Sequence, residues 1–268
     1  MKFISLALIA SVILTGPSYA EDKSDQEIDA YLQQNHKSLV LLEEGSLVLA
    51  PSISTSMSGQ DFGFASTSTT ENVISVAAAY GFSKRTQLVA NVPVGQVRNE
   101  TSFLDETDEQ VGRTGIMSVG IRHTLLYETG SLPEVVGAVT FGYPISDIPG
   151  AEPNIRAGIS VYQLLDPVLV SATAGLSTGT ETGAEQYDLS GSIDVALTHR
   201  FSMGLEAAWV SNKSQFGDPL NVGMTVTASA GISSPSGTSA LSPYIAIGVT
   251  DQAPDATVGI RWVRTWAR

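Results

Sequence analysis

The alternation of apolar and small polar residues after residue 46 constrains the fold more than any other feature of the sequence. In "VGMTVTASAGI", residues 222–232, every even position holds valine, methionine, alanine or isoleucine, and every odd position holds glycine, threonine or serine. A side-chain period of two belongs to the β-strand, in which successive residues face opposite sides. We read about twelve such strands, near residues 46–58, 70–80, 85–97, 114–127, 134–143, 154–164, 168–178, 185–198, 202–211, 221–232, 240–250 and 255–266.

The polar side of these strands distinguishes two all-β architectures. A soluble β-sandwich would expose large polar residues such as lysine and glutamate on that side. Here the side carries glycine, serine and threonine, which suit the limited space inside a barrel. The chain is also 43% hydrophobic and only 15% charged, which is low in charge for a soluble domain. We therefore predict an all-β fold: a transmembrane antiparallel up-and-down β-barrel of about 12 strands with a short N-terminal helix.

The connections between the expected strands alternate in length. Short ones such as "GFSKR" and "LLDP" follow even-numbered strands, whereas long acidic ones such as residues 98–115 follow odd-numbered strands. Short periplasmic turns and long extracellular loops are typical of outer-membrane barrels whose termini both face the periplasm. The turn "DQAPD" then lies outside the cell, where Asp251 and Asp255 stay in water and Pro254 needs no strand partner.

The first 45 residues predict two further segments. Residues 1–20 have the charge, apolar run and small residues of a cleaved secretory signal peptide. Residues 21–45 begin with a capping box, Ser24 and Glu27, and form a helical segment that is a candidate plug, with Ile28, Tyr31 and Leu32 on one face. Residues 46–268 are the barrel, which we expect in the outer membrane of a Gram-negative cell.

Several charged residues fall on the predicted interior side. By the alternation, the lumen-lining candidates are Arg122, Arg156, Asp188, Asp194, Glu206 and Arg261. One hypothesis is that they form a field across the pore that orients polar solutes. The other is that they only pair with one another and fill the barrel, because buried charges need partners whatever the function.

Aromatic residues near strand ends are candidates for the two rings that mark the membrane interfaces of such barrels. They are Tyr80, Tyr127, Tyr143, Tyr187, Trp209, Trp262 and Trp266. Arg264 points to lipid in the same register, at an interface where its long side chain can reach water.

The composition argues against several classes of function. A formal net charge of −13 gives no broad attraction for nucleic acid. The absence of cysteine removes disulfides and thiolate chemistry. His36, His123 and His199 show no ligand spacing, and no serine lies in register near His123 to act as a nucleophile. We therefore expect no metal, no cofactor and no enzyme activity.

Four stretches resemble a known family. They are "LEEGSLVLAPSIS", "AYGFSKRTQLVANVPV", "GRTGIMSVGIRHTLL" and "IGVTDQAPDATVGIRW", and they resemble outer-membrane transporter-like proteins grouped under the meta-pathway of phenol degradation. The resemblance implies an outer-membrane channel. A distantly similar branch exports functional-amyloid subunits through a twelve-stranded barrel that is gated by a helix before its first strand.

The sequence thus favours an outer-membrane channel for passive transport of small solutes, hydrophobic ones among them. The alternatives are an export pore for a secreted, amyloid-type polypeptide and a non-conducting structural barrel. The partners to expect are outer-membrane lipid, the barrel insertion machinery and the solute or exported polypeptide, without nucleic acid. A homotrimer is one candidate assembly.

Overall fold

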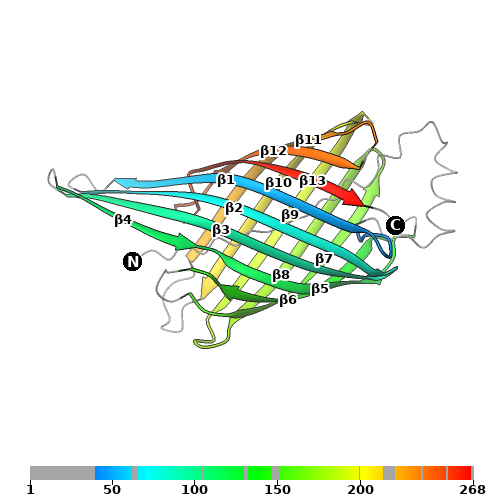
Figure 1. Cartoon of the computed structure of the whole chain (residues 1–268), viewed down its shortest axis with the longest axis horizontal. Coiled ribbons are helices and arrows are strands. Elements are labelled where there is room, and N and C mark those ends of the chain that lie inside the picture. The colour runs from blue at the N-terminus through cyan, green and yellow to red at the C-terminus, as the bar shows by residue number, and fades with distance from the viewer. Residues whose placement is uncertain are drawn as a thin grey trace.

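The computed structural model describes residues 40–61, 65–103, 106–129, 132–146, 151–198, 200–213, 221–236, 238–251 and 253–266. These residues form thirteen strands joined in one antiparallel sheet (Figure 1). The strands are β1 (Leu47–Asp61), β2 (Ala65–Ser83), β3 (Thr86–Phe103), β4 (Glu106–Thr114), β5 (Ile116–Leu126), β6 (Glu134–Pro144), β7 (Asn154–Leu165), β8 (Val168–Gly179), β9 (Glu185–Thr198), β10 (Phe201–Lys213), β11 (Asn221–Ser233), β12 (Ser239–Gly248) and β13 (Ala256–Trp266).

The sheet closes on itself because β1 pairs with both β2 and β13. Around the ring, each remaining strand pairs with its neighbours in sequence, except that β3 pairs first with β5 and then, further along, with β4. Twelve strands therefore make the closed barrel and β4 lies outside the ring, which confirms the predicted count and architecture. The end at which β1 begins and β13 ends is called the terminal end, and the opposite end the projecting end.

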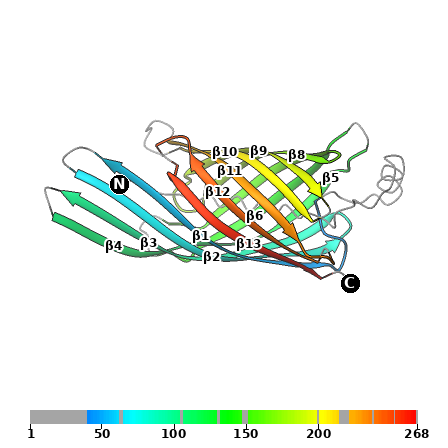
Figure 2. The same ribbon diagram turned by 90° about the horizontal axis from the view of Figure 1, so that it is seen from above.

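The long loop expected over residues 98–115 is instead a hairpin. Its two halves pair from Gly95 with Thr114 to Phe103 with Glu106, so that β3 continues and β4 runs back beside it. At Gly115, where φ is 151°, the chain passes from β4 into β5. The prediction was wrong because both faces of this hairpin carry polar side chains, so it shows no apolar alternation. With the β1–β2 hairpin it projects well beyond the rest of the barrel (Figures 1 and 2).

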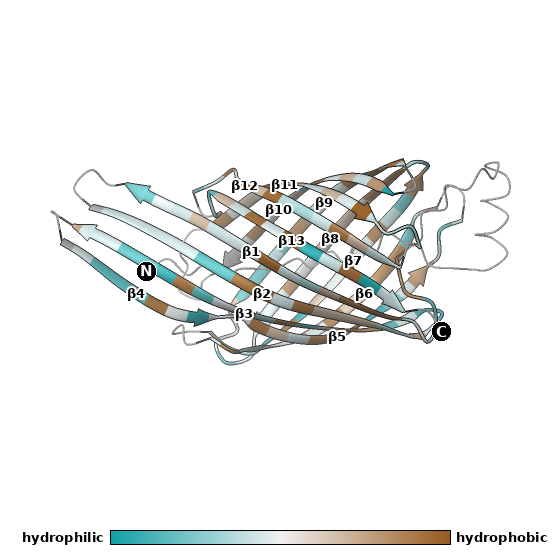
Figure 3. Ribbon diagram, turned by 45° about the horizontal axis from the view of Figure 1, so that its top comes forward, coloured by the Kyte–Doolittle hydropathy of each residue, from teal (hydrophilic) through white to brown (hydrophobic). Residues whose placement is uncertain are grey.

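The outward side of the barrel is an apolar belt. Ile53, Val94 and Val119 illustrate it: their side chains are 52–58% exposed although each lies within a long strand. Figure 3 shows apolar residues over the barrel strands and polar residues over the projecting ends of β1–β4. No helix in the described ranges is long and apolar enough to cross a membrane. Strands with an apolar outer face and a polar inner face give a transmembrane β-barrel, as predicted.

The inward side carries small polar side chains. Ser54 and Ser56 of β1, Ser75 of β2, and Ser190 and Ser192 of β9 are all buried inside the barrel. This agrees with the predicted division of each strand into an apolar outer and a small polar inner side.

The predicted aromatic residues lie toward both ends of the barrel. Tyr80 and Trp266 both pair with Leu47, the first residue of β1, at the terminal end. Arg264 is exposed there and its guanidinium lies 5.2 Å from the ring of Trp266. The remaining predicted aromatics lie at strand ends or a few residues inside them. Tyr127 and Trp262 are toward the terminal end, and Tyr143, Tyr187 and Trp209 are toward the projecting end.

Candidate functional site: the barrel lumen

Two of the predicted lumen charges form an ion pair across a strand. Arg156 on β7 donates from Nε to Oδ1 of Asp188 on β9 at 3.0 Å and from Nη2 to Oδ2 at 2.6 Å. Between them on β8 lies Gly175, whose added β-carbon would come within 2.7 Å of both side chains. The missing side chain therefore lets two strands that are not neighbours exchange a two-pronged contact. Such a contact is stronger and more directional than a single hydrogen bond.

The other predicted charges have different partners. Arg122 donates from Nη2 to the hydroxyl of Tyr162 at 2.9 Å, rather than to one of the predicted carboxylates. Arg261 interacts electrostatically with Glu206 and with Tyr244. Of the six candidates, the structure thus brings Arg156 to Asp188 and Arg261 to Glu206.

Asp194, the sixth candidate, lies in a wall of hydroxyl groups. Ser192 donates to its Oδ2 at 3.2 Å, and Ser192 is in turn 2.8 Å from the hydroxyl of Ser171. On the next strand Gly204 leaves room for the carboxylate, because an added β-carbon would lie against Oδ1 of Asp194. This part of the interior is polar, and it can hold water or a polar solute.

Three interior polar residues were missed by the sequence analysis. Glu71 is 4% exposed, and Gln87 and Glu134 are fully buried. Each follows the same alternation as its strand: Glu71 is in phase with Val73 and Ser75, whose side chains are also buried. All three lie inside predicted strands, where the alternation already puts them on the polar face, but the list of lumen candidates did not include them.

The terminal end of the lumen is crossed by residues 40–45, here called the latch segment. Val40 and Leu41 pack in one apolar cluster with Val136 of β6 and Tyr162 of β7. Leu42 belongs to a second cluster, whose other members are Val48, Ala79, Val89 and Val263 of β1, β2, β3 and β13. Since β7 lies far from β1 around the ring in both directions, a segment that contacts both walls spans the lumen.

Hydrogen bonds fix the latch segment to β2 and β3. The backbone N–H of Leu42 donates to Oε1 of Gln87 at 3.1 Å. The N–H of Gly45 donates to the carbonyl of Gly81 at 2.8 Å. Gly81 cannot carry a side chain here, because a β-carbon would overlap the backbone carbonyl of Glu43. The strand is therefore built to accept the segment closely.

The predicted helical plug lies outside the described residues, including Ile28, Tyr31 and Leu32. The last six residues of the predicted segment, 40–45, are described and are not helical. The signal peptide expected at residues 1–20 also lies outside the described ranges.

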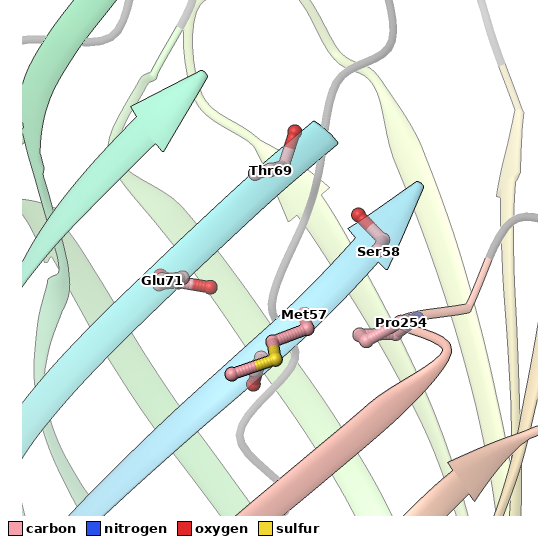
Figure 4. A pocket seen from close by; sticks show the side chains of 6 residues that line it. Met57, Ser58, Thr69, Glu71 and Pro254 are labelled. Atoms are coloured by element: carbon pink, nitrogen blue, oxygen red, sulfur yellow. The ribbon is translucent and has the colours of Figure 1, made fainter. Parts of the chain in front are cut away.

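At the projecting end, the turn between β12 and β13 folds against β1. Asp255 accepts from the N–H of Gly59 through Oδ2 at 2.7 Å, while Asp251 is exposed. Beneath Pro254 is a cavity of about 10 Å³ (Figure 4), which is the size of one water molecule. It is lined by Ser56, Met57, Ser58, Thr69, Glu71 and Pro254.

His123, the histidine within the described residues, plays no part in this interior. His123 faces outward, where Nδ1 lies 2.9 Å from the hydroxyl of Thr86. His36 and His199 lie outside the described residues. Within the described ranges no three histidine, aspartate or glutamate side chains come together as metal ligands.

The chain matches no known family model and no curated protein. It is similar in structure to the COG4313 outer membrane channel from Pseudomonas putida F1, with a TM-score of 0.62 and 10% identity over 84% of this chain and 97% of that one. It is also similar to the transport unit of the autotransporter AIDA-I from Escherichia coli, with a TM-score of 0.53 and 10% identity over 91% of this chain and 98% of that one. For the translocator domain of the autotransporter NalP from Neisseria meningitidis, the TM-score is 0.51 and the identity 12%, over 91% and 98% of the two chains. At these identities, what the chain shares with outer-membrane channel and translocator barrels is the fold.

Proposed function

We propose that the chain is an outer-membrane β-barrel channel for passive transport of small solutes, with its terminal end toward the periplasm. One observation carries the proposal: a closed barrel with an apolar outer belt encloses an interior of hydroxyl and charged side chains. A barrel that only packed its own core would have little use for such an interior, because each buried charge must be compensated. The likeness in fold to an outer-membrane channel supports the same function.

The lumen favours small polar solutes over the hydrophobic ones that the sequence analysis includes. The Arg156–Asp188 pair, Asp194 and the hydroxyls of Ser171 and Ser192 line one wall. A hydrophobic solute would have to displace water from these groups without replacing its hydrogen bonds. A polar solute can exchange one set of hydrogen bonds for another.

The latch segment closes the periplasmic end of this channel at rest. Its three apolar side chains, Val40, Leu41 and Leu42, meet apolar residues on both walls, so closing removes apolar surface from water on both sides. The segment is short and enters the barrel from one side of β1, so a solute or a voltage can displace it without unfolding a strand. The channel is thus gated by its own chain.

The test is single-channel conductance in a planar bilayer with a reversible cross-link. The native chain has no cysteine, so Leu41→Cys with Val136→Cys introduces two thiols within one apolar cluster. A short bis-methanethiosulfonate reagent joins them, and dithiothreitol releases them. We expect few openings in the joined state and steady openings after release.

The matched control is Ile53→Cys with Ile74→Cys, two residues that pair on neighbouring strands of the outer wall. This cross-link leaves the latch segment free, so conductance is expected to match the unmodified chain before and after reduction. Equal conductance of the latch variant in both states would refute the gate. If neither these proteins nor Leu41→Asp conducts after correct insertion, the chain is a non-conducting structural barrel.

A further inference from the structure

We infer that the lumen selects cations over anions, and that Asp194 is the residue that a permeating cation meets. The inference rests on the proposed function and names the charge class of solute that such a channel takes. Its basis is the balance and the pairing of charged side chains on the inner wall.

Carboxylates outnumber guanidiniums among the described interior positions of the twelve barrel strands. Five carboxylates, Glu71, Glu134, Asp188, Asp194 and Glu206, face three guanidiniums, Arg122, Arg156 and Arg261. The difference, five less three, leaves a formal charge of −2 on the described inner wall. In a narrow pore with low-dielectric walls, such an excess raises the local concentration of cations.

The partners and the burial of each carboxylate decide which of them a permeating ion can meet. Asp188 is held by Arg156 through two hydrogen bonds, and Glu206 is matched electrostatically with Arg261. Glu71 is 4% exposed and lines the small cavity beneath Pro254 (Figure 4). Glu134 is fully buried and accepts a hydrogen bond from the hydroxyl of Thr124. These four carboxylates therefore offer little to a passing ion.

Asp194 differs from them in both partner and exposure. The hydroxyl of Ser192 donates to it, no arginine or lysine of the described residues pairs with it, and its side chain is only half buried. Its Oδ1 occupies the space over Gly204, on the side of the Ser229 hydroxyl. A carboxylate beside the hydroxyl oxygens of Ser171 and Ser192 offers the oxygen-rich environment that hard cations prefer.

The expected permeant class is small cations, and among organic solutes those that carry an amine. An anionic solute would be repelled by the net charge. Asp188 already holds the guanidinium of Arg156, and the guanidinium of Arg122 donates to the hydroxyl of Tyr162. Rings or walls of acidic side chains give the same preference in cation channels generally.

The experiment is the reversal potential of the full-length channel in a gradient of potassium chloride, with Leu41→Asn, which adds no charge to the lumen, used to raise the open probability. We expect potassium to permeate more readily than chloride. Asp194→Asn should lower the potassium-to-chloride permeability ratio about twofold, as expected for a unit charge several ångströms from the ion path in water. Insertion and folding are checked by the heat-dependent gel mobility of each variant.

One control isolates the lumen charge. Asp251→Asn removes the same charge from an exposed turn and should leave the ratio unchanged. A ratio of one or below in the native channel, or an unchanged ratio in Asp194→Asn, overturns this inference while leaving the channel in place. Absence of any conductance overturns the proposed function itself.

Discussion

The lumen is built from the same alternating strands along its whole length, but its inward side chains are apolar at the terminal end and polar toward the projecting end. At the terminal end, inward positions such as Val48, Ala79 and Val136 are apolar and enclose a piece of the chain itself. Toward the projecting end, inward positions hold serines and the Arg156–Asp188 pair. A β-barrel therefore does not have one kind of interior: the side chains at each level match whatever occupies that level.

Two glycines of the inner wall make room for different parts of the chain. Gly81 makes room for backbone, because its missing side chain faces the carbonyl of Glu43. Gly204 makes room for the end of a side chain, the carboxylate of Asp194. Backbone that is tied by hydrogen bonds cannot move aside cheaply, whereas the end of a side chain can rotate. We therefore expect an added side chain to have a larger effect on channel opening at Gly81 than at Gly204.

The largest effect is expected from Gly81→Ala. Its β-carbon overlaps the backbone of the latch segment, so the segment must leave its seat, at a cost of about 1–3 kcal/mol for an overpacked site. We expect the equilibrium between open and closed channel to shift toward the open state by about fivefold to a hundredfold, since about 1.4 kcal/mol shifts an equilibrium tenfold. Single-channel recording measures it, and labelling of Leu42→Cys by a maleimide in the same background should become faster. Unchanged labelling would mean that the segment tolerates the added methyl group.

The next largest effect is expected from Arg156→Gln, toward the projecting end of the lumen. It leaves the nearly buried carboxylate of Asp188 without its guanidinium, which costs about 2 kcal/mol because the arginine itself is partly exposed to lumen water. Urea unfolding followed by gel mobility should show the loss, and the second substitution Asp188→Asn should recover most of it. A double variant as unstable as the single one would show that the pair contributes packing rather than charge compensation.

A smaller effect is expected from Gly204→Ala, the counterpart of Gly81→Ala. The carboxylate of Asp194 can turn away, so the stability loss should stay below about 1 kcal/mol. The gate should be unaffected, because residue 204 does not contact the latch segment in either apolar cluster. An open probability that rises as it does in Gly81→Ala would contradict this difference between the two glycines.

The smallest effect is expected at the projecting end, where Glu152 binds the turn between β8 and β9. Partial burial acts to raise the pKa of this carboxyl, but hydrogen bonds from the Thr182 hydroxyl and from the N–H groups of Thr182 and Glu181 lower the pKa below its ordinary value of 4.5. A lowered pKa means that the contact stabilises the turn above pH 4.5 and is lost as the pH falls through the folded value. A carbon-13 titration of the Glu152 carboxyl in micelles should give a midpoint below 4.5. A midpoint at or above 4.5 would show that the turn is not held this way.

The sequence by itself determined the barrel. The period of two, the small inward residues and the number of segments are local properties of each strand, so they can be read one strand at a time. The same alternation placed Arg156 and Asp188 on the inner side, because facing is fixed by position along a strand. Even the missed residues Glu71 and Glu134 obey it.

Only the tertiary structure decided which residues of different strands contact one another inside the barrel. Arg156 reaches Asp188 over Gly175 because three strands close in one particular register. Residues 40–45 enter the lumen because apolar positions from β1, β2, β3, β6, β7 and β13 converge at one level. The hairpin of β3 and β4 forms although it lacks an apolar alternation, since pairing of backbone groups does not depend on it. Each of these contacts depends on how distant strands align once the barrel closes, and no single stretch of sequence carries that information.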